Sequence, residues 1–170
     1  MAMPVGAFFR HNAWANQRLI DVCVACSNEH LGTRAAAAYG SILETLVHLV
    51  ASEQRYIRRL GGDLPTSPIV EGDQPSLEEL KQATVANGEV LTALAASASS
   101  DAVVSGQEGS LAFESEAAVF LVQTVTHSAE HRTQVITMLS TLGIGPEGLD
   151  EQLDAWAWGE ATGALRTRPA

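Results

Sequence analysis

The segment 114–142, ESEAAVFLVQTVTHSAEHRTQVITMLSTL, decides the fold of this 170-residue chain. Apolar side chains occupy nearly the whole circumference of the helix that it would form. A helix of that kind is buried on several sides, so it belongs inside a bundle. Gly143 follows the last apolar turn and is expected to end the helix. The apolar positions are Phe120, Leu121, Val122, Val125, Ile136 and Leu139.

Three other segments repeat apolar residues at helical spacing. The first begins near Val5 and ends near Cys26, and the second extends from about Ser41 to Leu60 before a Gly-Gly pair. A capping box, Ser76 with Glu79, opens the third. The Pro- and Gly-rich stretch 63–75 between the second and third helices is too long for a tight turn. The sequence therefore predicts an all-α fold, a four-helix bundle with one long crossover.

Two further segments complete the prediction. Residues 103–113 have enough β-branched and turn residues for a short hairpin but also suit a plain loop, and both alternatives stay open. The run D-E-Q-L-D-A-W-A-W-G-E near the C-terminus predicts one short helix. We expect a single domain over residues 1–163 and a tail over 164–170.

Composition limits the classes of function. The net charge is −10, with one lysine and nine arginines, which argues against nucleic acid as a partner. No apolar run approaches the ~20 residues that cross a bilayer, so no membrane partner is expected. The N-terminus lacks a basic region before an apolar stretch and does not resemble a secretion signal. We therefore expect a cytoplasmic protein.

His127 and His131, in T-H-S-A-E-H-R-T-Q, are the main candidate metal ligands. Residues four apart on a helix point the same way, so both imidazoles can reach one ion. His48 lies in the second predicted helix and could supply a third ligand, leaving an open position suited to catalysis. Zinc and nickel favour such nitrogen ligands. Each histidine shares its helix face with polar side chains: Glu44, Ser52 and Arg55 near His48, and Gln123, Thr124 and Gln134 near the pair.

These polar strips have two interpretations. They could lie in solvent, or they could line an internal pocket while the apolar backs of the helices pack elsewhere. Matching strips on two helices favour the pocket. Asn12 and Asn16, inside the apolar stripe of the first helix, similarly either face a polar pocket or bond across the bundle. His11 and His30 are expected to be structural or solvated.

Two motifs in the sequence suggest other functions. H-S-A-E-H fits the inverted zincin pattern with Glu130 as general base, but no larger peptidase domain surrounds it. Cys23 and Cys26 have C-x-x-C spacing, yet no strand precedes them as a thioredoxin-like site requires. They are better explained as small side chains on a buried stripe.

Several segments together resemble the DinB/YfiT-like superfamily. F-F-R-H-N-A-W-A-N-Q-R-L resembles its first helix and S-I-L-E-T-L-V-H-L-V-A-S-E-Q-R-Y its second; H-S-A-E-H-R-T-Q and L-D-A-W-A-W resemble its last bundle helix and its C-terminal element. The resemblance implies up-down-down-up topology, a homodimer and a divalent metal ion, commonly zinc or nickel. It also implies that the equivalents of His48, His127 and His131 hold that metal.

Members of this superfamily include transferases and isomerases that use mycothiol, bacillithiol or glutathione. The resemblance therefore implies a thiol-dependent enzyme acting on a small-molecule substrate, whose catalytic and thiol-binding residues the sequence does not identify. Arg132 and Arg55 would then either hold an anionic group or lie in solvent, and Glu44 and Glu130 would be partners of the imidazoles. The alternative is a non-catalytic, stress-related protein that binds a metal or a small molecule.

Overall fold

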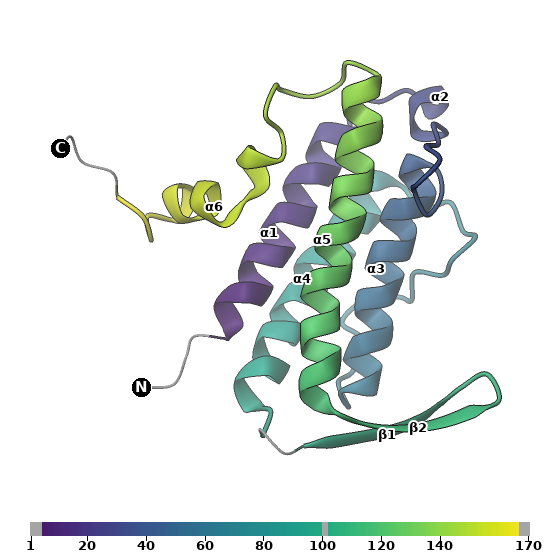
Figure 1. The fold of residues 1–170 in the computed structure, drawn as a ribbon, viewed down its shortest axis with the longest axis vertical. Helices are drawn as coiled ribbons and strands as arrows, with labels where there is room; N and C mark the ends of the chain where they lie inside the picture. Colours follow the sequence, from purple (N-terminus) through teal and green to yellow (C-terminus); the bar gives the residue numbers. More distant parts are fainter. Residues whose placement is uncertain (1–4, 100–101, 167–170) are drawn as a thin grey trace.

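The protein is a bundle of four long helices in a computed structural model that describes residues 5–99 and 102–166 (Figure 1). This confirms the predicted fold class. A one-turn helix, a two-stranded hairpin, a short 3-10 turn and a C-terminal helix are added to the bundle. The elements are α1 (Gly6–Cys23), α2 (Asn28–Leu31), α3 (Ile42–Arg59), α4 (Leu77–Ser97), β1 (Val103–Glu108), β2 (Leu111–Glu116), α5 (Ala117–Thr141), η1 (Glu151–Leu153) and α6 (Ala155–Thr162).

The helices run up, down, down and up. In Figure 1, α1 rises, α3 descends on the other side of α5, and α5 rises again from the hairpin. The long segment 60–76 carries the chain back so that α4 runs parallel to α3. Lys81, near the start of α4, contacts Asp21, near the end of α1, at 2.5 Å, which shows that these two helices are antiparallel. The predicted topology and crossover are therefore both present.

Capping boxes set where α3 and α4 begin. The Ser41 hydroxyl accepts from the backbone N–H of Glu44, whose carboxylate accepts from the backbone N–H of Ser41 at 2.7 Å. Ser76 and Glu79 form the same reciprocal pair before α4, as predicted. These pairs satisfy N–H groups that a helix start otherwise leaves without partners. The first capping box fixes where α3 begins, and therefore the direction in which His48 points from that helix.

The apolar core has two parts. The larger lies toward the end of the bundle where α1 and α5 finish and includes Leu19, Leu46 and Leu139. The smaller, around Phe9, Ile57 and Leu91, lies toward the hairpin end. The apolar stripe of α3 is buried in both, which turns its polar strip toward α5.

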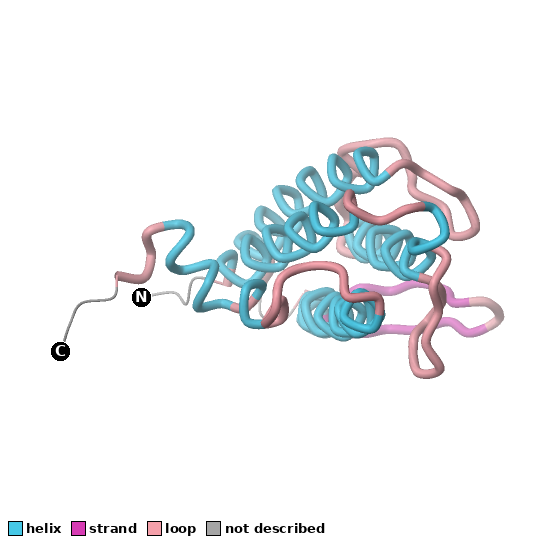
Figure 2. The backbone as a smooth tube through the Cα atoms, turned by 90° about the horizontal axis from the view of Figure 1, so that it is seen from above, coloured by secondary structure: helices cyan, strands magenta, loops and turns pink. Residues whose placement is uncertain are grey.

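Residues 103–116 form an antiparallel hairpin, which settles the question left open by the sequence. Gly106 pairs with Phe113, whose ring fills the space where another residue would place its Cβ atom. Seen from above, the hairpin and α6 extend to opposite sides of the bundle (Figure 2). Phe113 packs near Phe120 of α5, which anchors the hairpin to the bundle.

Helix α5 is less buried than its composition suggested, because Val119 and Val122 are 55% and 63% exposed. The helix packs mainly against α3 and α1, and its outer face has no described neighbour. The predicted tail, 164–170, lies mostly in residues 167–170, outside the described ranges. Within the described part of the chain, no helix has the length and apolar character that crossing a membrane requires.

Candidate metal centre

Three imidazoles meet between α3 and α5. Nε2 of His127 lies 3.1 Å from Nε2 of His48 and 3.2 Å from Nε2 of His131. One nitrogen from each residue falls within 4.8 Å of the others, so the three could hold a metal ion. His131 is buried and the other two are partly buried. The structure thus brings together the three residues singled out in the sequence. The polar strips are only partly internal, because Ser52 and Thr124 are buried whereas Glu44 and Gln123 are exposed.

The spacing of these nitrogens suits a metal ion. Metal–nitrogen bonds of about 2.0–2.1 Å in a tetrahedral site separate two nitrogen ligands by roughly 3.3 Å. The two measured separations, 3.1 and 3.2 Å, are close to that value. Imidazole lone pairs that face one another at this distance repel unless a proton or a cation lies between them. The donor set therefore fits a divalent ion that favours nitrogen.

The outward-facing nitrogens of two imidazoles have acceptor partners. Nδ1 of His48 lies 3.0 Å from Oε1 of Glu71 in the crossover, and Nδ1 of His131 lies 2.9 Å from Oε1 of Gln134. A carboxylate and an amide carbonyl only accept, so each Nδ1 carries the proton. Each Nε2 then keeps its lone pair for the centre of the cluster. Partners of this kind fix the tautomer and orientation of metal-binding histidines.

Tyr39 covers one side of the cluster. Its ring stacks on His48 with centroids 3.8 Å apart and planes 18° apart. Its backbone N–H donates to Gln134 Oε1 at 3.0 Å and its hydroxyl donates to Glu71 at 2.6 Å. One residue of the α2–α3 connection thus contacts both of the imidazole partners. Tyr39 holds the crossover and α5 in place around the histidines.

The electrostatic environment favours the neutral form of two of the imidazoles, those of His48 and His127. Burial and, to a lesser extent, the other two histidines lower the pKa of His127 to about 4. Burial also lowers the pKa of His48, although Glu71 opposes that shift. A neutral imidazole is the form that binds a metal ion. His48 and His127 are therefore in the metal-binding form at neutral pH.

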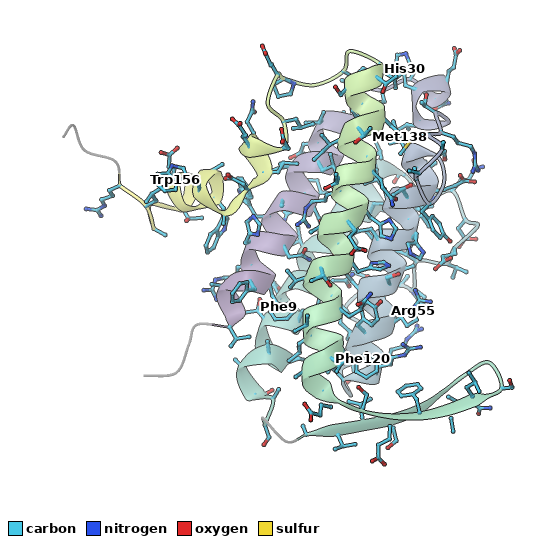
Figure 3. All side chains as sticks on the ribbon, viewed as in Figure 1. Phe9, His30, Arg55, Phe120, Met138 and Trp156 are labelled. Carbon is cyan, nitrogen blue, oxygen red and sulfur yellow. The ribbon has the colours of Figure 1, made fainter. Side chains whose placement is uncertain are left out.

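Other polar residues near the strips take different places from those expected. Glu44 caps α3 and pairs with Arg34, so its predicted role as an imidazole partner is wrong. Glu130 is exposed on α5, and the described imidazole contacts go to Glu71 and Gln134 instead. Arg55 is partly exposed, donates to Ser52 and lies 3.7 Å from Glu71. Figure 3 shows it on α3, above Phe120.

Arg132 was expected either to hold an anionic group or to lie in solvent, and both expectations are wrong. Its side chain is buried, and Nη1 donates to the amide oxygens of Asn12 and Asn16, both at 2.7 Å. The amide nitrogens of these asparagines donate to Oε1 of Glu53 at 2.8 and 2.9 Å. Burial raises the pKa of Glu53 to about 7, while its amide donors and Arg132 oppose the rise. The two asparagines therefore bond across the bundle, as one of the two predictions stated.

The cysteines and the remaining histidines lie in structural environments. Cys23 is fully buried and Cys26 partly so, and burial raises the pKa of both thiols. His11 bonds to the carbonyl of Leu153, and His30 belongs to the capping box of α2. These contacts agree with the structural interpretation of all four residues.

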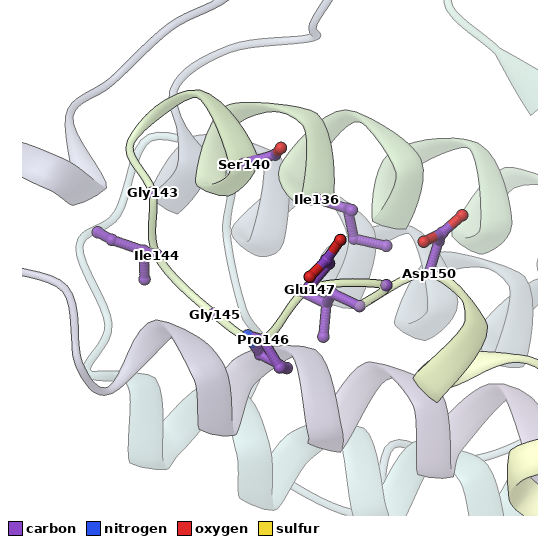
Figure 4. Close-up of a pocket in the computed structure, with 10 residues that line it drawn as sticks. Ile136, Ser140, Gly143, Ile144, Gly145, Pro146, Glu147 and Asp150 are labelled. Atoms are coloured by element: carbon purple, nitrogen blue, oxygen red, sulfur yellow. The ribbon is translucent and has the colours of Figure 1, made fainter.

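A separate hollow of about 340 Å³ lies beside the end of α5 (Figure 4). Residues of α5 and of the loop 143–150 line it, including Ile136, Ser140 and Glu147. None of the three clustered histidines is among its lining residues. The candidate metal centre and this hollow are therefore distinct.

Sequence reasoning missed Glu71, Tyr39 and Glu53 as parts of the site. Glu71 and Tyr39 lie in connections without helical periodicity, which gives no indication of where a side chain points. Glu53 was detectable in principle, because it interrupts the buried side of α3 between Val50 and Ile57.

Comparison with known proteins gives one family and a shared fold. The model of the DinB family matches residues 1–163. The crystal structure of a DinB-like protein from Bacillus cereus superposes with a TM-score of 0.62 at 15% identity, over 82% of this chain and 91% of that chain. That likeness concerns the fold alone. No functionally curated protein matches the chain.

Proposed function

Because the chain belongs to the DinB family, we propose that His48, His127 and His131 bind one divalent metal ion, zinc or nickel. The observation that carries the proposal is the convergence of their Nε2 atoms at 3.1 and 3.2 Å. The lowered pKa values of His48 and His127 and the acceptors at two Nδ1 atoms support it. A site with three protein ligands leaves a position for an exogenous group, as catalytic sites do.

We further propose that the protein is a thiol-dependent transferase or isomerase acting on a small-molecule substrate. A bound divalent ion supplies positive charge that lowers the pKa of a thiol beside it. In the reaction, the thiol proton passes to solvent and the sulfur forms a bond to an electrophilic carbon of the substrate. In a transfer, the leaving group departs with the electron pair of the bond that breaks. In an isomerisation, the sulfur adds to a double bond, whose π electron pair moves to the neighbouring atom, and the same carbon–sulfur bond breaks when that pair returns and the thiol departs.

The residues of the chain have supporting tasks in this reaction. Glu71 and Gln134 hold two imidazoles in the tautomer that directs Nε2 inward. Tyr39 excludes water from one side of His48 through its stacked ring. The nucleophile must come from outside, because Cys23 is buried and burial raises the pKa of both cysteine thiols. Mycothiol, bacillithiol and glutathione are the candidate thiols that family membership suggests.

Cobalt substitution tests the thiol proposal. Cobalt(II) replaces zinc in nitrogen sites and reports a sulfur ligand by a charge-transfer band in the near ultraviolet. We expect one of the three thiols to produce this band, with proton release and tighter binding as the pH approaches about 8.5. A cobalt spectrum unchanged by all three would contradict the thiol-dependent enzyme and favour a non-catalytic metal-binding protein.

A further inference from the structure

The buried polar cluster of Glu53, Arg132, Asn12 and Asn16 lies next to the histidines on both of the helices that carry them. Arg132 and Ser128 each follow one of the clustered histidines in sequence, and successive helix residues are about 100° apart around the axis. The histidines therefore face α3, while Arg132 and Ser128 face the interior and α1. Glu53 is five residues after His48 on α3.

The contacts in this cluster link three helices through two bridging amides. Each asparagine accepts from Arg132 with its oxygen and donates to Glu53 with its nitrogen. The Ser128 hydroxyl adds a donor to Glu53 at 3.4 Å. Glu53 is 2% exposed and Arg132 is 7% exposed, so neither charge can exchange its partners for water. A rotation of α5 would break both Arg132 contacts at once.

We propose that Glu53 and Arg132 are positioning residues for the metal centre, a role that rests on the proposed function. Through Asn12 and Asn16 they fix the rotation of α5 against α1 and α3. That rotation determines whether His127 and His131 face His48. Neither charged residue contacts the histidine nitrogens, so their effect on metal binding passes through the orientation of the helix.

The metal affinities of two single variants distinguish positioning from two alternatives, a direct electrostatic effect on the cation and a contribution to stability alone. Arg132→Met removes a positive charge, and Glu53→Gln removes a negative one while keeping the shape of the side chain. If the charges acted only through their electric field on the cation, Arg132→Met would tighten metal binding and Glu53→Gln would weaken it. If the cluster contributed only to stability, neither would change the affinity of the folded protein. Positioning predicts that both variants weaken binding, by about tenfold or more.

The experiment measures zinc affinity of the full chain by competition with a chromogenic chelator, well below each variant's unfolding temperature. Leu80→Ala is the control for lost stability, because Leu80 is fully buried on α4, which carries none of the three histidines. Its affinity should stay within about twofold of wild type. The double variant Glu53→Gln/Arg132→Met leaves no unpaired buried charge, so its metal affinity can be measured in place of a single variant that fails to fold. Its loss of affinity should be smaller than the product of the two single losses.

The outcomes are distinct. Loss of affinity in both single variants, or in the double variant if a single one does not fold, supports the positioning role. Opposite changes in the two singles, or wild-type affinity in every folded variant, would overturn it and leave the proposed metal site intact. Absence of zinc binding by the wild-type protein would overturn both proposals.

Discussion

Glu71 lies 3.0 Å from Nδ1 of His48, so a residue of the long crossover is bonded to the α3 histidine of the candidate metal centre. The same carboxylate accepts from the hydroxyl of Tyr39, which stacks on that imidazole. The crossover is therefore part of the candidate metal centre as well as the connection that makes α3 and α4 parallel.

Glu71→Gln should weaken metal binding by about tenfold, because a neutral amide is a poorer acceptor for the imidazole N–H than a carboxylate is. Competition titration with a chelator measures the change. Glu130→Gln is the matched control, since Glu130 lies on α5 between His127 and His131, is exposed and has no described contact to an imidazole. Equal affinities for the two variants would show that Glu71 does not tune the site.

The metal-free protein should lose stability as the pH falls from about 6.5 toward 4. The pKa of His127 is lowered to about 4 by burial, so below 6.5 the unfolded chain takes up a proton that the folded chain does not. Glu53 acts in the opposite sense, because burial raises its pKa. Denaturant unfolding at several pH values should show a shallower acid loss in His127→Gln than in wild type. Parallel stability curves would contradict the assignment of this acid dependence to His127.

Cys23→Ala/Cys26→Ala should keep its metal content and any thiol-transfer activity. Cys23 is fully buried, and burial raises the pKa of both thiols, which suppresses the reactive thiolate. A chromogenic disulfide reagent should label Cys23 of the native protein slowly and of the denatured protein at once. Loss of activity in a folded, metal-loaded double variant would identify the cysteines as catalytic.

We propose that the protein is a homodimer that covers the outer face of α5. Val119 and Val122 are more than half exposed there, and exposed apolar side chains gathered on one helix favour an interface. Light scattering should give twice the 18.0 kDa chain mass, and Val122→Asp should shift it toward the monomer. Val103→Asp, on the equally exposed hairpin, should not. A wild-type mass near that of one chain at all concentrations would refute the dimer.

The helices and the existence of the long crossover were predictable from the sequence, but the places of individual side chains in the connections were not. Apolar spacing and the Ser76 capping box located the helices, and the four-residue interval of His127 and His131 indicated their common direction. The three histidines meet only if α3 and α5 are rotated about their axes so that these side chains face each other. Only the matching polar strips indicated that rotation.

The predicted environments of Arg132 and Glu44 were wrong, because the residue pattern of one helix does not identify the partners that other segments supply. Arg132 is buried because Asn12, Asn16 and Glu53 on other helices satisfy it, and no interval within α5 encodes those partners. Glu44 lies on the same strip as His48, yet its position three residues after Ser41 makes it a helix cap. Local capping competed with the tertiary role that the strip suggested.

The most direct test of the metal centre is the metal content of freshly purified protein, measured by mass spectrometry for wild type and for alanine variants of His48, His127 and His131. His30→Ala, outside the cluster, is the control. We expect close to one zinc or nickel ion per wild-type chain, unchanged in the control and sharply lower in His127→Ala. Unaltered metal content in all three cluster variants would contradict the site.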